Sequence, residues 1–304
     1  MDRTRAPLKP AQLRLAVVGA GLMGRNHLRA AKAAGIEIAG VMDADADRAH
    51  AAAAEFGCTI APDLRTMGAV VIAIPTAAHA ATALTLLQAG IHCLIEKPLA
   101  PSEAECEALI DAAETAGAVL QVGHVERFNP AVDALLAQGI SPTDVTLITS
   151  RRTGPAGARV SDVSVVADLM VHDLDIVLAL KPLPVTQVRA IGNRDHAEAE
   201  LTFADGAIAT LVASRVAASR QRDLVVKTGG GEYRLDFIAK SLLRPARPAR
   251  DPVAAAVFTG DALSAQLKHF VASIRGEHSP RVTGEIALDA MRLVWRIEAA
   301  LEGH

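Results

Sequence analysis

The stretch LRLAVVGAGLMG, residues 13–24, joins a short apolar run to a glycine-rich hexapeptide. The hexapeptide has the G-x-G-x-x-G spacing, with glycines at Gly19, Gly21 and Gly24. After a strand, the first glycine permits a tight turn, the second lets backbone amides approach a pyrophosphate, and the third allows close packing of helix on strand. An amphipathic helical pattern follows directly. The stretch therefore predicts the first βαβ unit of a Rossmann fold that binds a dinucleotide.

An aspartate stands where the ribose of such a dinucleotide is normally read. Asp43 ends the second predicted strand, nineteen residues after Gly24. A carboxylate there accepts hydrogen bonds from the adenosine ribose hydroxyls and repels a 2′-phosphate, which predicts NAD in preference to NADP. Arg48 leaves an alternative open, because its guanidinium could turn toward a 2′-phosphate, although an arginine on a helix is more often a solvated surface charge.

The rhythm of short apolar runs and longer amphipathic ones continues as far as about Val122. It is typical of βαβ units that build a parallel sheet. Ser102 and Glu105 have the spacing of a capping box, which predicts a helix start. We expect residues 1–123 to form an NAD-binding Rossmann domain. The predicted strands are 13–18, 36–42, 69–74, 91–95 and 118–122.

After Gly123 the pattern changes to one of antiparallel strands. Asn129-Pro130 predicts a short helix by its capping chemistry, and Asp205-Gly206 joins two β runs within 197–215. Residues 124–304 are expected to form an α+β substrate-binding and oligomerisation domain, with an open, mostly antiparallel sheet. The other predicted elements are a strand at 144–150, a strand pair within 222–238 around three glycines, an irregular loop at 244–252, and helices at 262–275 and 284–300.

Composition narrows the class of partner. The 304 residues carry a net charge of only −3, with acidic and basic residues mixed along the chain, so neither a nucleic acid nor a membrane surface is an expected partner. No apolar run approaches the roughly 18 residues of a membrane helix. Residues 1–12 lack the apolar core of an export signal, and the three cysteines are widely spaced. A cytoplasmic protein acting on a small molecule is expected.

Lys97 is the first candidate catalytic residue. The sequence Glu96-Lys97-Pro98 follows the predicted strand 91–95 directly. Its lysine is therefore expected at the carboxyl edge of the parallel sheet, where open α/β sheets bind ligands. The alternative is a surface lysine in a loop.

His172 is the second candidate. It lies on a mostly apolar predicted helix, Asp162 to Leu180, and shares one face with Asp168 and Asp175 at i, i+4 and i+7 spacing. Ionisable groups on a core-like helix are costly unless they are paired or line a polar cavity, so the stripe predicts a site. Asp173 is expected to point elsewhere, solvated or capping. A satisfied core histidine and a metal site are the alternatives, and we expect no metal because hydride transfer does not require one.

Taken together, these motifs resemble the Gfo/Idh/MocA family of oxidoreductases over nearly the whole chain. The resemblance depends on the glycine fingerprint, on Glu96-Lys97-Pro98, and on the Asp-x-x-x-His-x-x-Asp pattern of residues 168–175. It implies that Lys97 contacts the cofactor ribose and the reacting hydroxyl, that His172 takes or relays the proton, and that Asp168 positions substrate or imidazole. The chain departs from the family in having Val165, Val166 and Met170 where relatives often have glycine. The predicted cofactor-binding residues are Gly19, Gly21, Leu22, Met23, Gly24, Asp43, Pro75, Thr76, His79, Glu96 and Lys97.

Within this family, residues 122–130 look like the dehydrogenases that oxidise C3 of UDP-N-acetylglucosamine for the 2,3-diamino sugar of some bacterial lipid A. Holding a diphosphate needs cations, and Arg151 is one available guanidinium beside those in the predicted substrate set, although all could be solvated surface charges. The predicted substrate-binding residues are Arg127, Asn129, Arg152, Arg159, Asp168 and His172.

Three other functions stay open. The first is oxidation of another sugar or a cyclitol. The second is a glycosidase that uses NAD transiently, and the third is a non-catalytic nucleotide-sensing regulator, against which the presence of both Lys97 and His172 argues. By resemblance, the open sheet pairs subunits into a homodimer or homotetramer.

Overall fold

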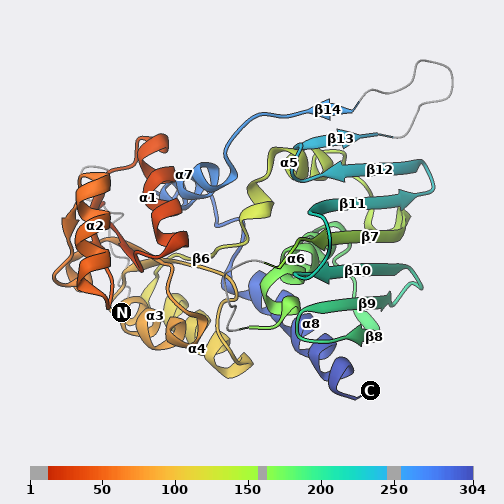
Figure 1. The fold of residues 1–304 in the computed structure, drawn as a ribbon, viewed down its shortest axis with the longest axis horizontal. Helices are drawn as coiled ribbons and strands as arrows, with labels where there is room; N and C mark the ends of the chain where they lie inside the picture. Colours follow the sequence, from red (N-terminus) through yellow and green to blue (C-terminus); the bar gives the residue numbers. More distant parts are fainter. Residues whose placement is uncertain (1–12, 157–162, 245–254, 304) are drawn as a thin grey trace. The chain divides into compact units, whose positions relative to one another are not determined.

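The structure is a computed structural model that describes residues 13–156, 163–244 and 255–303. It divides into two compact units, residues 1–124 with 261–288, and residues 125–260 with 289–304. Each unit has its own sheet, the first six-stranded and the second eight-stranded (Figure 1). None of the helices in the described ranges is both long and apolar enough to cross a membrane.

The first unit is a Rossmann domain, as the glycine-rich stretch predicts. All strands of its sheet are parallel, in the order β3-β2-β1-β4-β5-β6. From β1 the chain adds strands first toward one edge and then, from β4 onward, toward the other edge. This reversal creates the crevice at which doubly wound sheets bind ligands. The strands are β1 (Leu15–Val18), β2 (Ile38–Met42), β3 (Thr59–Ile60), β4 (Ala69–Ile72), β5 (His92–Ile95) and β6 (Leu120–Val122).

The helices of this unit form two groups on opposite sides of its sheet (Figure 1). One group holds α1 packed against α2 and α7, and the other holds α3 packed against α4. The capping box of Ser102 and Glu105 is present at the start of α4, as predicted. The helices are α1 (Leu22–Ala34), α2 (Ala46–Phe56), α3 (His79–Gln88), α4 (Glu103–Ala116) and α7 (Ala262–Ile274), with short turns η2 (Leu64–Thr66) and η3 (Thr76–Ala78).

The helix α7 gives the chain an organisation different from the predicted division at 123/124. It comes late in the sequence, yet Leu267, Phe270 and Ile274 are buried in the same core as Leu15 and Val17 of β1. Burying three large apolar side chains there is favourable by several kcal/mol. Residues 261–288 therefore belong to the first unit.

The second unit is an α+β domain whose sheet is antiparallel except where β7 pairs with β10. Its order is β14-β13-β12-β11-β7-β10-β9-β8. The strands are β7 (Val145–Thr153), β8 (Val185–Gly192), β9 (His196–Phe203), β10 (Ile208–Ser214), β11 (Gln221–Thr228), β12 (Gly231–Asp236), β13 (Ser241–Leu243) and β14 (Ala256–Val257). The expected open, mostly antiparallel sheet is thus confirmed.

One face of this sheet is covered by helices. Alternate side chains of the strands pack with residues of α5, α6 and the later part of α8 into one buried core. The helices are η4 (Val125–Phe128), α5 (Pro130–Leu136), η5 (Pro142–Asp144), η6 (Val166–Met170), α6 (Val171–Leu180) and α8 (Gly284–Glu302).

The predicted helix at 162–180 is only partly regular. Asp162 lies outside the described residues, η6 is a π-helical turn, and the α-helix α6 starts at Val171. A π turn adds a residue to the helical repeat, and such turns often mark functional sites. The β strands at 59–60, 185–192, 241–243 and 256–257 were not predicted, because they are short or partly polar.

Candidate active site

The glycine turn has the geometry that the sequence predicts. Gly19 has a positive φ of 94°, and a Cβ there would lie 2.2 Å from the carbonyl oxygen of Ala73. A Cβ on Gly24 would lie 1.6 Å from the carbonyl oxygen of Gly19. No side chain but hydrogen fits at either position. A Cβ on Gly21 would instead meet open space, which is where a ligand can approach the backbone at the start of α1.

Two residues of the turn present themselves to that space. Leu22 is a large apolar side chain with 65% of its surface exposed, at the first position of α1. Gly21, the residue before it, caps the helix without a side-chain hydrogen bond. A helix N-terminus with an exposed leucine at its first position fits a dinucleotide, whose pyrophosphate can accept from the amides.

Asp43 connects the end of β2 to the glycine turn. Its carboxylate accepts hydrogen bonds from the backbone N–H of Ala20 at 2.6 Å and of Asp45 at 2.8 Å. Arg48 forms an ion pair with the same carboxylate at 3.1 Å. Burial alone would raise the pKa of Asp43, but the two backbone donors and Arg48 outweigh it and lower that pKa. The group is therefore an anion at neutral pH, and Arg48 is occupied by it and by Asp45.

Lys97 follows β5 at the carboxyl edge of the parallel sheet, as expected. The peptide bond from Lys97 to Pro98 is cis. The preceding Glu96 is buried, and its carboxylate accepts from Nε2 of His27 at 2.7 Å and from the backbone N–H of Lys97 at 3.3 Å. Burial raises the pKa of Glu96, and His27 with Lys97 lowers it by more. Glu96 is thus an internal anion that fixes the lysine segment.

His27 is a residue that the sequence interpretation missed. It lies on α1 three residues after Gly24, is fully buried, and links that helix to Glu96. The available signal was a histidine on the sheet-facing side of the helix.

The ring of His79, which is predicted to bind cofactor, lies against backbone carbonyls. The ring is buried, with Nδ1 3.0 Å from the Pro98 oxygen and Nε2 2.9 Å from the Ile74 oxygen. It thereby joins the segment after β4 to the segment after β5. Pro75 and Thr76, also predicted to bind cofactor, begin η3 between these two contacts.

In the second unit, each aspartate of the η6–α6 segment lies beside an arginine. Asp168 is 3.8 Å from Arg215 and is partly exposed. Asp175 is buried 3.1 Å from Nε of Arg127. Burial raises the pKa of Asp175 to about 7, although Arg127 opposes that shift. His172 lies between them in the sequence and is half-buried.

The expectation that Asp173 is solvated or capping is wrong. Its side chain is 2% exposed and receives two hydrogen bonds of 2.9 Å from the Arg152 guanidinium. Arg152 also donates to Glu126 at 2.8 Å and stacks over the ring of Phe237 at 4.8 Å. Arg152 and Asp173 lie on different elements, 21 positions apart in the chain, and the spacing of residues along a helix does not reveal such a pair.

Several of the predicted substrate-binding residues make contacts within the protein. Arg152 is 1% exposed with all three guanidinium nitrogens donating to carboxylates, and the Arg127 guanidinium faces Asp175. Asn129 caps α5 and also donates to Glu126 and to the Phe237 carbonyl. Arg152, Arg127 and Asn129 therefore each contact other residues of the chain. Arg159 lies outside the described residues.

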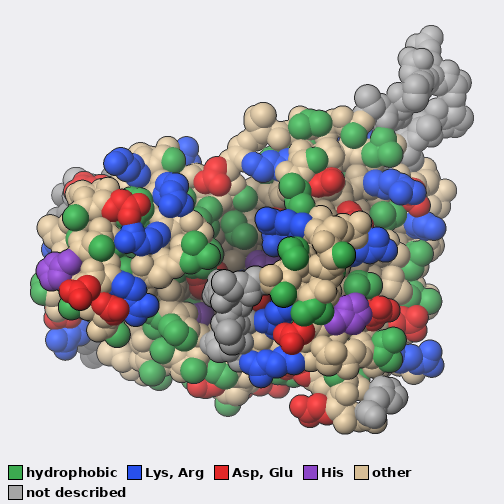
Figure 2. Space-filling view, in the orientation of Figure 1, with side chains coloured by type: hydrophobic (Ala, Val, Ile, Leu, Met, Phe, Trp, Pro, Cys, Tyr) green, Lys and Arg blue, Asp and Glu red, His purple; other side chains and the backbone are tan. Residues whose placement is uncertain are grey.

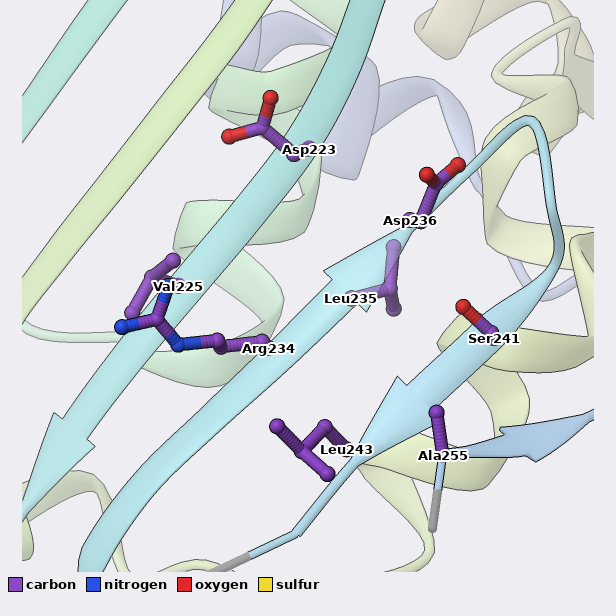
Figure 3. Close-up of a pocket in the computed structure, with 8 residues that line it drawn as sticks. All are labelled: Asp223, Val225, Arg234, Leu235, Asp236, Ser241, Leu243 and Ala255. Carbon is purple, nitrogen blue, oxygen red and sulfur yellow. The ribbon is translucent and has the colours of Figure 1, made fainter.

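A separate hollow of about 230 Å³ lies on β11, β12 and β13 (Figure 3). None of the predicted catalytic residues lines it. The residues that line the hollow are Asp223, Val225, Arg234, Leu235, Asp236, Ser241, Leu243 and Ala255.

On the face drawn in Figure 2, the described Lys and Arg side chains are interspersed with Asp and Glu, in keeping with the near-neutral composition.

Comparison with known proteins identifies relatives along the whole chain. Residues 13–124 match the model of the Gfo/Idh/MocA oxidoreductase family, NAD-binding Rossmann fold. The chain is 33% identical to the UDP-N-acetylglucosamine 3-dehydrogenase of Acidithiobacillus ferrooxidans, across 95% of this chain and 97% of the relative. It is 28% identical to the D-apiose dehydrogenase of Paraburkholderia graminis, across 92% and 85% respectively.

Solved structures of related proteins are similar to this one along nearly the whole chain. The A. ferrooxidans enzyme has a TM-score of 0.89 at 32% identity, covering 96% of this chain and 98% of that one. A levoglucosan dehydrogenase in complex with NADH has a TM-score of 0.85 at 18% identity, covering 96% and 98%, which shows a shared fold. With its glycine turn and its Glu96-Lys97-Pro98 segment in place, the chain belongs to the Gfo/Idh/MocA family of oxidoreductases, which have an NAD-binding Rossmann fold.

Proposed function

We propose that this protein is an NAD-dependent dehydrogenase of a nucleotide sugar, with the C3 hydroxyl of UDP-N-acetylglucosamine as the first candidate. One observation carries the proposal: the similarity, over nearly the full length of both chains, to an enzyme named for that reaction. The product would be the 3-keto nucleotide sugar, which suits the route to a 2,3-diamino sugar of lipid A. A cytoplasmic location stays a prediction.

The chain's own residues supply binding and proton transfer. Bound NAD supplies the hydride acceptor. We assign to His172 the removal of the hydroxyl proton, to Lys97 assistance in that step, and to Asp168 the orientation of substrate or imidazole. Lys97 is set by the Glu96 and Pro98 contacts within the first unit, and His172 by the ion-paired helix within the second.

Asp43 supports NAD rather than NADP. Its ionised carboxylate stands at the end of β2, beside the glycine turn, where it can accept from ribose hydroxyls and repel a phosphate. Arg48 is the residue that could favour NADP, but its guanidinium is shared between Asp43 and Asp45. Turnover with NAD is therefore expected to exceed turnover with NADP.

The proposal is tested by following NADH absorbance while the purified protein and NAD meet a panel of substrates. The panel holds UDP-N-acetylglucosamine, UDP-glucose, N-acetylglucosamine, D-apiose and myo-inositol. We expect NADH with UDP-N-acetylglucosamine and a 3-keto product by mass spectrometry. NADH from D-apiose or inositol alone would reject the nucleotide sugar. Sugar hydrolysis without net NADH would indicate the glycosidase, and binding without turnover the regulator.

A homodimer or homotetramer is also proposed. The helices of the second unit cover one face of its sheet, while the other face carries the hollow of Figure 3 and partly exposed apolar side chains such as Val225 and Leu243. A second copy of this chain would cover it. Light scattering at micromolar concentration should give at least twice the 31.7 kDa chain mass, and a monomer mass would refute the proposal.

A further inference from the structure

Arg222, on β11, has an unusual environment for a cation. It is partly buried, and its Nε has no hydrogen-bond partner. Among the described residues, no carboxylate forms an ion pair with its guanidinium. A partly buried guanidinium whose Nε has no acceptor is costly, so such a group is expected to meet an anion when the protein functions.

The surrounding charges do not supply that anion. Arg222 lies directly across from Arg152 in the register of β11 and β7. The two nearby carboxylates, Glu126 and Asp173, already receive the hydrogen bonds of Arg152. Burial lowers the pKa of Arg222, the positive charges of Arg152 and the exposed Arg220 lower it further, and Glu126 and Asp173 raise it by less. The local balance therefore favours an added negative charge.

The position of Arg222 relates it to the proposed catalytic helix. Side chains alternate along a strand, so Arg222 shares the helix-covered face of β11 with the buried Leu224 and Val226. Its cross-strand neighbour Arg152 is bonded to Asp173, which directly follows His172. Arg222 thus lies one strand away from the pair that holds the His172 helix, within the same unit.

We propose that Arg222, with Arg220 beside it, forms an anion subsite that binds a phosphate of a nucleoside diphosphate sugar. The subsite rests on the proposed function, because it gives the substrate's diphosphate its place in the second unit. A guanidinium suits this task, since its fork of N–H donors matches two phosphate oxygens. All three guanidinium nitrogens of Arg152 already donate to carboxylates, which leaves Arg222 to contact the ligand.

The test compares Arg222→Met with Arg222→Lys, and with Arg292→Met as a matched control. Arg292 is an exposed arginine of α8 that pairs with Asp289. Titration calorimetry with UDP measures phosphate binding without turnover. We expect Arg222→Met to weaken UDP binding by about 10- to 100-fold, as for a lost charged hydrogen bond. Arg222→Lys should lose less, and Arg292→Met should bind as the wild type does.

Thermal unfolding separates binding from a structural role. Because Arg222→Met removes a cation with no internal partner, its melting temperature should equal or exceed that of the wild type. N-acetylglucosamine, which lacks phosphate, should lose no affinity in the same variant. Unchanged UDP binding in Arg222→Met, or a lowered melting temperature with UDP binding intact, would overturn the proposal.

The two proposals fail separately. If the wild type oxidises UDP-N-acetylglucosamine and Arg222→Met keeps the same KM, the anion subsite is wrong while the proposed function stands. If the wild type binds UDP through Arg222 yet yields no NADH with any UDP-sugar, the subsite stands and the dehydrogenase proposal is wrong.

Discussion

Lys97 obtains its place from residues on both sides of it in the chain. Glu96 fixes its backbone N–H from the buried side, and the carbonyl of Pro98 lies against the ring of His79. The lysine itself is only half-buried, at the edge of the parallel sheet. A half-buried side chain whose backbone is held on both sides is suited to act on a substrate.

Replacing Lys97 or His172 by alanine should reduce kcat by roughly 10²- to 10⁴-fold, the range for loss of a positioned acid or base. Binding of NADH should fall by much less than kcat, because the glycine turn and Asp43 are untouched. Steady-state kinetics with the preferred substrate and fluorescence titration with NADH measure the two effects. Lys268→Ala, on the exposed side of α7, is the control. Near-normal turnover in either site variant would reject its assigned role.

Asp43→Asn tests the choice of cofactor. The amide keeps the shape but removes the charge that opposes a 2′-phosphate, so the ratio of kcat/KM for NADP to that for NAD should rise about 10-fold or more. The exposed Asp47→Asn on α2 is the comparison and should leave the ratio unchanged. The interpretation fails if Asp43→Asn discriminates against NADP as strongly as the wild type.

At the scale of elements, α6 is held in its unit by charge pairs rather than by amphipathic packing alone. Asp173 pairs with Arg152 of β7, and Asp175 pairs with Arg127 of η4. Buried pairs contribute less net stability than their number suggests, but they are strongly destabilising when broken from one side. The helix therefore has a fixed position relative to the strand that ends beside it.

Asp173→Asn should lower the free energy of unfolding by about 3–5 kcal/mol, because it leaves the buried Arg152 without one of its two carboxylates. Urea unfolding followed by circular dichroism measures the change. The double variant Arg152→Met with Asp173→Leu removes both charges and should recover part of the loss. A loss below about 1 kcal/mol in Asp173→Asn would show that the pair is not stabilising.

Asp175 makes stability depend on pH in the opposite sense to a usual carboxylate. Its folded pKa of about 7 lies above the ordinary value of 3.8, so the folded state holds the proton more tightly. The resulting stabilisation is complete below about pH 4 and is lost as pH rises toward 7. Relative to Asp175→Asn, the wild type should thus become less stable between pH 5 and pH 8. If the melting temperatures of the wild type and of Asp175→Asn changed equally with pH across this range, the raised pKa of Asp175 would be contradicted.

At the scale of the whole molecule, each unit is built from two separate segments of the chain. The chain leaves the Rossmann domain after His124 and returns to it at Asp261. The returning α7 buries Leu267, Phe270 and Ile274 in the Rossmann core. The first unit is therefore complete only when residues 1–124 and 261–288 are both present.

A fragment of residues 1–124 should consequently melt well below the intact protein, or fail to fold, because the α7 side of its core is exposed. Joining residues 261–283 to this fragment through a Gly/Ser linker should restore a cooperative transition. Circular dichroism melting of both fragments makes the comparison. Equal melting temperatures would show that α7 is dispensable.

Local features of this molecule were predictable from the sequence, and long-range ones were not. The glycine turn, Asp43, the capping box at Ser102 and the hairpin at Asp205-Gly206 depend on neighbouring residues, and the structure contains them all. The Asp173–Arg152 pair joins residues 21 positions apart on different elements, which no spacing rule specifies. The apolar pattern of α7 predicted a helix but did not indicate which core receives it.

The late return of α7 has a consequence for how the polypeptide is made. A ribosome emits the six parallel strands first and the α7 residues only after more than a hundred others, which include nearly all of the second unit. Domains generally fold in the order of their synthesis. Here the Rossmann unit is synthesised first, but the apolar surface that α7 covers stays exposed until α7 is translated. The nascent chain thus has a built-in period of vulnerability, during which chaperone binding should be greatest.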